Sequence, residues 1–167
     1  MTIRTTTFIC LALVVGPGAQ AADAPEQNSQ ASALERRVST LESIQPGLGV
    51  VMHEMGYRFA NIYWAANGGN WDLAQYQLKE LREAQDVGKV TRPQRAPMLA
   101  AYDESHLVPL SEAIGKKDIT QFNRRFTTAM QGCNACHTAL GFGYIRYRVP
   151  QEPREELLDF SAGEGTP

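Results

Sequence analysis

The sequence predicts an all-α protein built as an antiparallel four-helix bundle, with a short N-terminal amphipathic helix before it. Four long segments repeat their apolar residues at steps of three and four, which is the period of a helix with one buried face. No segment alternates apolar and polar residues with the β-branched enrichment of a strand. Two short turns and one longer crossing join the four segments, which favours antiparallel neighbours.

The N-terminal residues 1–21 have the pattern of a secretory signal peptide. Arg4 supplies the positive charge, residues 8–15 form a short apolar run, and a small-x-small motif ends at Ala21. We therefore expect cleavage after Ala21 and export to the periplasm. A membrane anchor is the competing interpretation, but the run is too short to span a bilayer. A lipoprotein needs a cysteine at the cleavage site, whereas Cys10 lies inside the apolar run.

The segment that follows the signal peptide contains a short helical pattern, which is weaker than those of the four long segments. Residues 22–32 are small and polar, and we expect them to form a flexible leader. Leu34, Val38 and Leu41 then recur at helical spacing and predict a short amphipathic helix over 33–44. Its narrow apolar stripe fits the seam of a homodimer, and it equally fits docking onto the chain's own bundle.

The predicted bundle domain spans residues 33–150, and its first long core helix covers 48–66. The turn 67–69 is rich in residues that tolerate positive φ and ends that helix. Asn70 is placed to cap the second helix, whose apolar face continues to Gln85. These two helices are expected to form a tight hairpin.

The second half of the domain is punctuated by proline and glycine. We expect the longest internal connection at 88–97, where proline interrupts any helix, and a third helix over 98–114, bent at Pro109. Asp118 is expected to cap the fourth helix. The acidic end of the chain, 151–167, is expected to be loosely ordered.

The chemistry is concentrated in the pentapeptide Cys133-Asn134-Ala135-Cys136-His137, on the apolar face of the fourth helix. Two thiols three residues apart on a helix face the same side, so they can form thioether bonds to the two vinyl groups of one porphyrin. His137, one step further round, can bind the iron as proximal ligand. With the signal peptide removed, Cys133 and Cys136 are the only cysteines. The pattern predicts one covalently attached haem c on the C-terminal helix.

Other uses of a C-x-x-C motif fit this chain poorly. A thioredoxin-like redox pair requires a βαβ context, and the pattern here is helical. Structural zinc usually takes four cysteine or histidine ligands, and only His53 and His106 remain outside the pentapeptide. A disulfide between the two cysteines accounts neither for His137 nor for the helix.

The opposite face of the iron decides between two kinds of function, because a strong sixth ligand makes an electron carrier and an open site admits gases. Met52 and Met55 share the apolar face of the first core helix, and either thioether could reach an iron held on the fourth. The competing interpretation is that both are core residues. Phe59 on the same face is expected to pack against the porphyrin or to join the ordinary aromatic core.

Arg146 and Arg148 follow the motif and could pair with the haem propionates as bidentate donors, or lie in a solvated tail. The whole chain of 167 residues carries a formal net charge of −2, and nothing in its composition indicates a nucleic acid partner. No apolar run in the mature part is long enough for membrane insertion. The partners that we expect are redox proteins.

A C-x-x-C-H motif in the last helix of a four-helix bundle, behind an export signal, resembles the cytochrome c′-like class. More narrowly, Asn70-Trp71-Asp72-Leu73-Ala74, the pentapeptide and Gly141-Phe142-Gly143 are similar to a family of small exported bundle cytochromes. The resemblance implies haem on the fourth helix and a distal residue from the first, which favours Met52. Typical cytochromes c′ carry a basic residue one turn after the haem histidine, where this chain has Gly141.

We therefore predict a periplasmic c-type cytochrome that transfers single electrons and is not an enzyme. The alternative is a five-coordinate haem protein that binds nitric oxide or carbon monoxide, with Met52, Met55 and Phe59 around the gas. A third interpretation makes the chain a haem subunit of a larger oxidoreductase.

Overall fold

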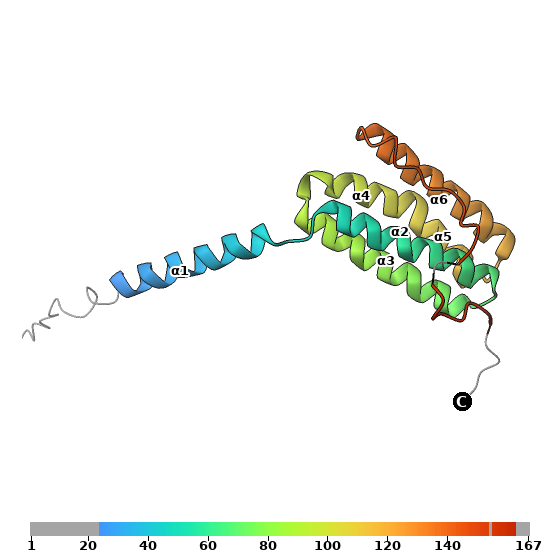
Figure 1. The fold of residues 1–167 in the computed structure, drawn as a ribbon, viewed down its shortest axis with the longest axis horizontal. Helices are drawn as coiled ribbons and strands as arrows, with labels where there is room; N and C mark the ends of the chain where they lie inside the picture. Colours follow the sequence, from blue (N-terminus) through green and yellow to red (C-terminus); the bar gives the residue numbers. More distant parts are fainter. Residues whose placement is uncertain (1–23, 154, 163–167) are drawn as a thin grey trace, which may run out of the picture. The chain divides into compact units, whose positions relative to one another are not determined.

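The computed structural model describes residues 24–153 and 155–162, and within them every regular element is a helix (Figure 1). The chain forms two units, residues 1–44 and 45–167. The division between them falls later than the predicted start of the bundle domain at residue 33. The predicted signal peptide, 1–21, lies outside the described residues.

The first unit contains helix α1 (Ala24–Ser43), which is longer than predicted. The flexible leader expected at 22–32 is helical from Ala24 onward, so that prediction is wrong there. The segment has no glycine, its alanine, glutamine and glutamate residues favour helix, and Pro25 stands in the first turn, where a missing N–H costs nothing.

The second unit is a set of helices that pack against one another, an arrangement compatible with a helical bundle. In Figure 1, α2 and α3 lie side by side, while α4, a π-helical turn and α5 form one continuous rod. The described residues contain no strand, only an isolated bridge between Gly69 and Ser161. The elements are α2 (Leu48–Asn67), α3 (Trp71–Thr91), the 3-10 turn η1 (Pro93–Arg95), α4 (Ala96–Tyr102), the π-helical turn η2 (Asp103–Leu107), α5 (Val108–Gly115) and α6 (Ile119–Ala139).

The connection between α3 and α4 is much shorter than predicted. Helix α3 continues through Gly88 to Thr91, which leaves only a 3-10 turn before α4. Gly88 is buried at a close approach of α2, because a Cβ there would lie 3.1 Å from Val51 Cγ1 and 3.2 Å from Leu48 Cδ1. The glycine therefore serves helix packing and does not end the helix.

The third predicted helix is interrupted just before Pro109, the residue at which a bend was predicted. The helix widens into η2, where the Val108 N–H bonds to the Asp103 carbonyl, and Pro109 then stands in the first turn of α5. A wider turn accommodates a residue that cannot donate a hydrogen bond. Tyr102 is the last residue of α4 before this turn.

The core of the second unit is centred on aromatic contacts between α2 and α6. Phe59 and Phe126 stack with ring centroids 4.2 Å apart and an interplanar angle of 17°. Phe122 is fully buried beside them, 5.7 Å from Phe126 between ring centroids. Such aromatic pairs contribute beyond the area that they bury. They hold α2 against α6, the two helices that carry the predicted site residues.

Both predicted N-caps are confirmed. Asn70 Oδ1 accepts a hydrogen bond of 3.0 Å from the Leu73 N–H at the start of α3. Asp118 Oδ1 accepts one of 2.9 Å from the Gln121 N–H at the start of α6. Each cap satisfies a donor that the first helical turn leaves without a partner.

The C-terminal segment is better ordered than predicted over 155–162. Phe160 packs half-buried against the core, and the Ala162 N–H bonds to the Gly68 carbonyl at 3.0 Å. The Tyr57 hydroxyl donates a 2.6 Å hydrogen bond to Glu155. The acidic composition of the segment therefore did not indicate that Phe160 packs against the core.

None of the described helices is both long enough and apolar enough to cross a membrane.

The Asp118 cap gives a direct test of how α6 is stabilised. We expect Asp118→Ala to lower the free energy of unfolding by about 0.5–2 kcal/mol, because the Gln121 N–H loses its acceptor. Urea denaturation measures the change. Asp118→Asn keeps a capping oxygen and should stay close to the wild-type protein, and equal losses in both variants would contradict the capping role.

Candidate functional site

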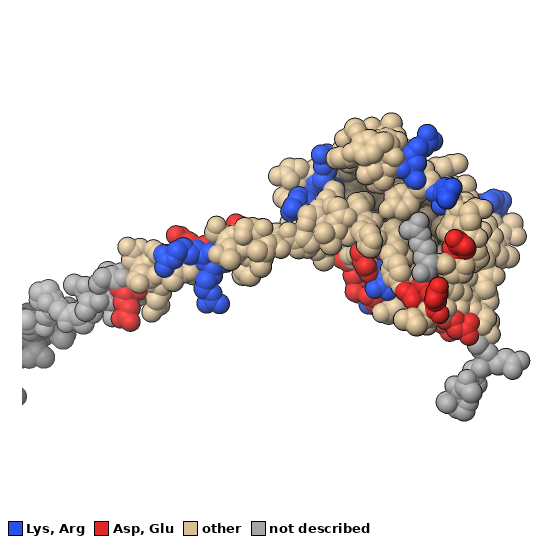
Figure 2. Space-filling view, in the orientation of Figure 1, with Lys and Arg blue, Asp and Glu red and all other residues tan. Residues whose placement is uncertain are grey.

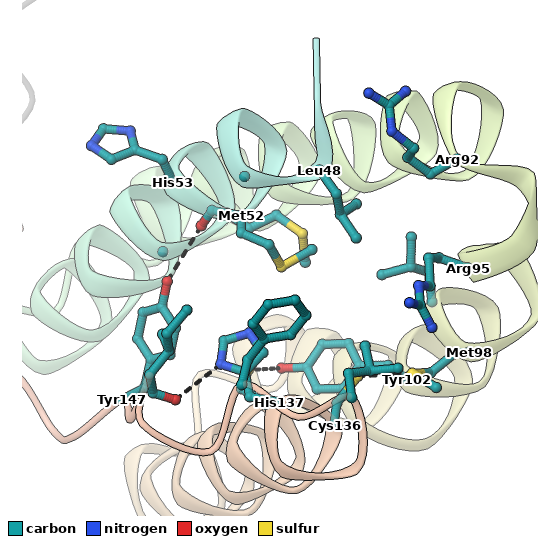
Figure 3. Close-up of a pocket in the computed structure, with 18 of the residues that line it drawn as sticks. Leu48, Met52, His53, Arg92, Arg95, Met98, Tyr102, Cys136, His137 and Tyr147 are labelled. Atoms are coloured by element: carbon teal, nitrogen blue, oxygen red, sulfur yellow. Dashed lines mark hydrogen bonds between the residues drawn. The ribbon is translucent and has the colours of Figure 1, made fainter.

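A pocket of about 740 Å³ lies in the second unit, bounded by α2, the η1–α4 region, α6 and the segment after α6 (Figure 3). Small-molecule and cofactor sites commonly have volumes of ~300–1,000 Å³. The lining is largely apolar and includes no aspartate or glutamate. The pocket therefore suits a large apolar guest.

The pocket brings together predicted residues that are far apart in the sequence. Its lining includes Cys133, Cys136 and His137 of α6 together with Met52 and Met55 of α2, and also Phe59. Figure 3 shows Met52 and His137 on opposite sides of the cavity. Met52 is half-buried, whereas Met55 is buried and belongs to the core.

One hydrogen bond determines the orientation of the His137 ring. His137 is 9% exposed, and its Nδ1 lies 3.1 Å from the carbonyl oxygen of Ile145. A carbonyl can only accept, so Nδ1 carries a proton, and in the neutral imidazole the lone pair is then on Nε2. A metal-binding histidine is commonly held in this way by its second nitrogen.

Asn134, a residue inside the pentapeptide, holds the segment after α6 at Tyr147, two residues beyond Ile145. The Asn134 side chain donates to the Tyr147 carbonyl at 3.0 Å and accepts from the Tyr147 N–H at 2.7 Å. The Tyr147 hydroxyl then donates to the Met52 carbonyl at 3.3 Å. Gly56 on α2 leaves room for the ring, because a Cβ there would collide with the phenol. These contacts connect the α6 side of the pocket to the α2 side.

Gly141 ends α6 with backbone geometry that other residues rarely adopt. Its φ is +82°, the Phe142 N–H bonds to the His137 carbonyl at 2.8 Å, and the Gly141 N–H bonds to the Thr138 carbonyl at 3.1 Å. This pair of bonds is a Schellman motif. The place where typical cytochromes c′ carry a basic residue is here occupied by glycine because the chain turns sharply back toward the pocket.

Both thiols are reduced and have polar neighbours. Cys133 Sγ lies 3.0 Å from the Tyr102 hydroxyl, and Cys136 donates to Met98 Sδ at 3.0 Å. Tyr102 and Met98 line the pocket and are residues that sequence reasoning missed. The only signal in the sequence that could have indicated them is their spacing of four residues, which places them on one face of the helix after the proline-rich segment 88–97.

Burial keeps these groups neutral. It raises the pKa of the Cys133 thiol to about 11, although the hydrogen bond with Tyr102 acts in the opposite direction. Burial also raises the pKa of Cys136, which Arg95 partly lowers. The pKa of Tyr102 is well above its ordinary value, chiefly through burial and then through Cys133. At neutral pH the pocket therefore contains neutral thiols and a neutral phenol.

The cationic groups at the pocket are not the predicted ones. Arg146 and Arg148 are exposed and do not line the pocket, whereas Arg92 and Arg95 are half-buried and do. Sequence reasoning missed the latter pair because it placed them in a long loop. His53 also borders the pocket, but it is exposed and its ring points away from the cavity in Figure 3.

On the face of the second unit that Figure 2 shows, the two kinds of charge lie on different sides. Figure 2 shows Lys and Arg side chains mainly toward α4 and α6, and Asp and Glu side chains mainly toward α3 and the C-terminal segment.

Across the described part of the chain, no group of three or more His, Cys, Asp or Glu side chains could hold a bare metal ion.

Comparisons of the chain with protein-family models, with curated proteins and with solved structures found no match.

Asn134 provides a test of how the segment after α6 is held. We expect Asn134→Ala to increase amide exchange around Tyr147 roughly tenfold or more, because two hydrogen bonds of ~0.5–1.5 kcal/mol each are lost. Hydrogen–deuterium exchange with mass spectrometry measures it. Asn134→Asp keeps the acceptor for the Tyr147 N–H and should give an intermediate rate, while unchanged exchange in both variants would contradict this role.

Proposed function

We propose that the chain is an exported c-type cytochrome of the cytochrome c′-like class, with one covalently bound haem c and a role as a one-electron carrier. The observation that carries the proposal is that Cys133, Cys136 and His137 share one apolar pocket with Met52 on its opposite side. When bound, haem supplies an iron that alternates between Fe(III) and Fe(II). The carrier transforms no substrate.

The residues of the pocket fit this group. Cys133 and Cys136 are free thiols that would hold it by thioether bonds, and the Nε2 of His137 is available as proximal ligand. The hydrogen bond from His137 Nδ1 to the Ile145 carbonyl makes the imidazole a stronger donor. A stronger donor favours the oxidised over the reduced state of a bound metal.

Met52 is the distal ligand that we favour. Its side chain is only half-buried and faces the pocket, whereas Met55 is part of the packed core and would have to leave it. The Tyr147 hydroxyl holds the backbone of Met52 at its carbonyl oxygen. A thioether ligand favours electron transfer at a six-coordinate site.

The second candidate function is binding of nitric oxide or carbon monoxide at five-coordinate iron. The observation in its favour is the nature of the α2 side, where Leu48, Met52 and Phe59 present apolar groups to the cavity. If Met52 stays unbound, these residues form a dry site that suits a small gas. The two functions therefore differ in the position of one side chain.

Arg92 and Arg95 are the propionate partners that we favour in place of Arg146 and Arg148. Both line the pocket, both are half-buried, and guanidinium groups bind carboxylates with bidentate geometry. No acidic residue of the pocket lining competes for them.

The finer features of the fold and setting belong to the same proposal. They are an antiparallel four-helix bundle with haem on α6, a signal peptide cleaved after Ala21 and a periplasmic location. The partners are redox proteins, and charge on the side of α4 and α6 favours those with acidic surfaces.

Covalent attachment is tested by removing the thiols. We expect the double variant Cys133→Ala, Cys136→Ala to lose haem staining on a denaturing gel completely, because no thioether can form. Each single variant should keep staining at a reduced level. Met98→Leu, which changes the neighbour of Cys136 but no thiol, is the matched control and should stain fully. Staining in the double variant would defeat the proposal.

Distal ligation is tested by comparing Met52→Ala with Met55→Ala in the oxidised and reduced proteins. We expect the wild-type protein to show a methionine-to-iron charge-transfer band and no spectral change with carbon monoxide. Met52→Ala should lose the band and bind carbon monoxide, because the sixth position opens. Met55→Ala should keep the band while unfolding becomes easier by about 2–5 kcal/mol, as expected for a buried core methionine. Carbon monoxide binding by the wild-type protein would favour the gas-binding function.

A further inference from the structure

Helix α1 carries an apolar stripe that is exposed in the single chain. Leu34 and Leu41 are each 60% exposed, and Val38 is 45% exposed. Large apolar side chains in a row on one helix face usually have a partner in the working protein. The described residues of the first unit offer none besides α1 itself.

The stripe has the spacing of a coiled-coil seam. Ala31, Leu34, Val38 and Leu41 follow one another at steps of three, four and three residues, which is the alternation of a and d positions in a heptad. Ala31 and Val38 then occupy a positions, and the two leucines occupy d positions. A β-branched residue at a with leucine at d favours two parallel strands. The seam is narrow, unlike the broad apolar face that binds a membrane surface.

The charges beside the seam indicate the direction of pairing. In this register Arg37 occupies a g position and Glu42 occupies the e position of the next heptad. In a parallel pair, each g side chain faces that e side chain of the partner helix, so Arg37 of one chain meets Glu42 of the other. In an antiparallel pair, g faces g and e faces e, which brings like charges together.

Arg37 and Glu42 form no ion pair within the described part of their own helix. Neither Arg37 nor Glu42 has an oppositely charged residue three or four positions away, the spacing at which helical side chains interact. The opposite charges are therefore available to a second helix.

We propose that α1 pairs with α1 of a second copy of this chain as a parallel, in-register, two-stranded coiled coil. Apolar contacts at Leu34, Val38 and Leu41 supply the association, and the Arg37–Glu42 pairs between chains set its direction. The seam covers few heptads, so the association is weak and depends on concentration. It does not require haem or the proposed electron transfer.

Sedimentation equilibrium of the purified protein over a wide concentration range tests the proposal. We expect the mass to rise from one chain to two. Val38→Asp should raise the dissociation constant at least ~10-fold, because it places a charge in the seam. Ser39→Asp adds the same charge one residue outside the seam and should change the constant less than about twofold. Circular dichroism establishes that each variant is folded.

Charge exchange tests the direction of the pair without disturbing the seam. Arg37→Glu and Glu42→Arg should each weaken association, because like charges then meet between parallel helices, and the double variant should restore it. A single-chain mass at every concentration would overturn the proposal. The proposal would also be overturned if Val38→Asp left the dissociation constant unchanged, or if the double variant associated as weakly as the single ones. Binding of a different protein or of anionic vesicles in place of self-association would overturn it as well.

Discussion

The pocket depends on the aromatic contact between α2 and α6. Phe59 stacks on Phe126, and one turn further along α2 Tyr63 also packs on Phe126. At the far end of this contact, Asn67 and Asn123 exchange side-chain hydrogen bonds. The two helices are thus joined along the C-terminal half of α2 and the N-terminal half of α6, and the remaining halves carry the pocket residues. The stack thus helps to place Met52 of α2 and His137 of α6 around the same pocket.

The sequence contained the local part of this structure. The caps at Asn70 and Asp118 and the four helical patterns depend on residues a few positions apart, so a single sequence reveals them. Cys133, Cys136 and His137 could be predicted as site residues for the same reason, since they lie within five consecutive residues.

Several of the errors involved contacts between segments that are distant in the sequence. Gly88 resembles a helix end in sequence, but here it lets α3 approach Val51, a contact that no local rule reveals. Phe160 anchors a tail whose composition indicates disorder, because its partner surface is the turn after α2. Arg92 and Arg95 reach the pocket only because α3 is longer than predicted. Local composition cannot report which surface a segment meets.

The charge of the pocket limits the class of ligand that it can bind. The pKa values of Cys133 and Tyr102 are raised by burial, so neither group is an anion at neutral pH. Arg92 and Arg95 then leave the lining with positive charge and no carboxylate to offset it. A purely apolar ligand would leave these two half-buried cations without an anionic partner in the pocket lining, which is unfavourable. A bare cation would be repelled. A large apolar body with anionic groups at one edge satisfies both requirements, and haem with its two propionates is such a molecule.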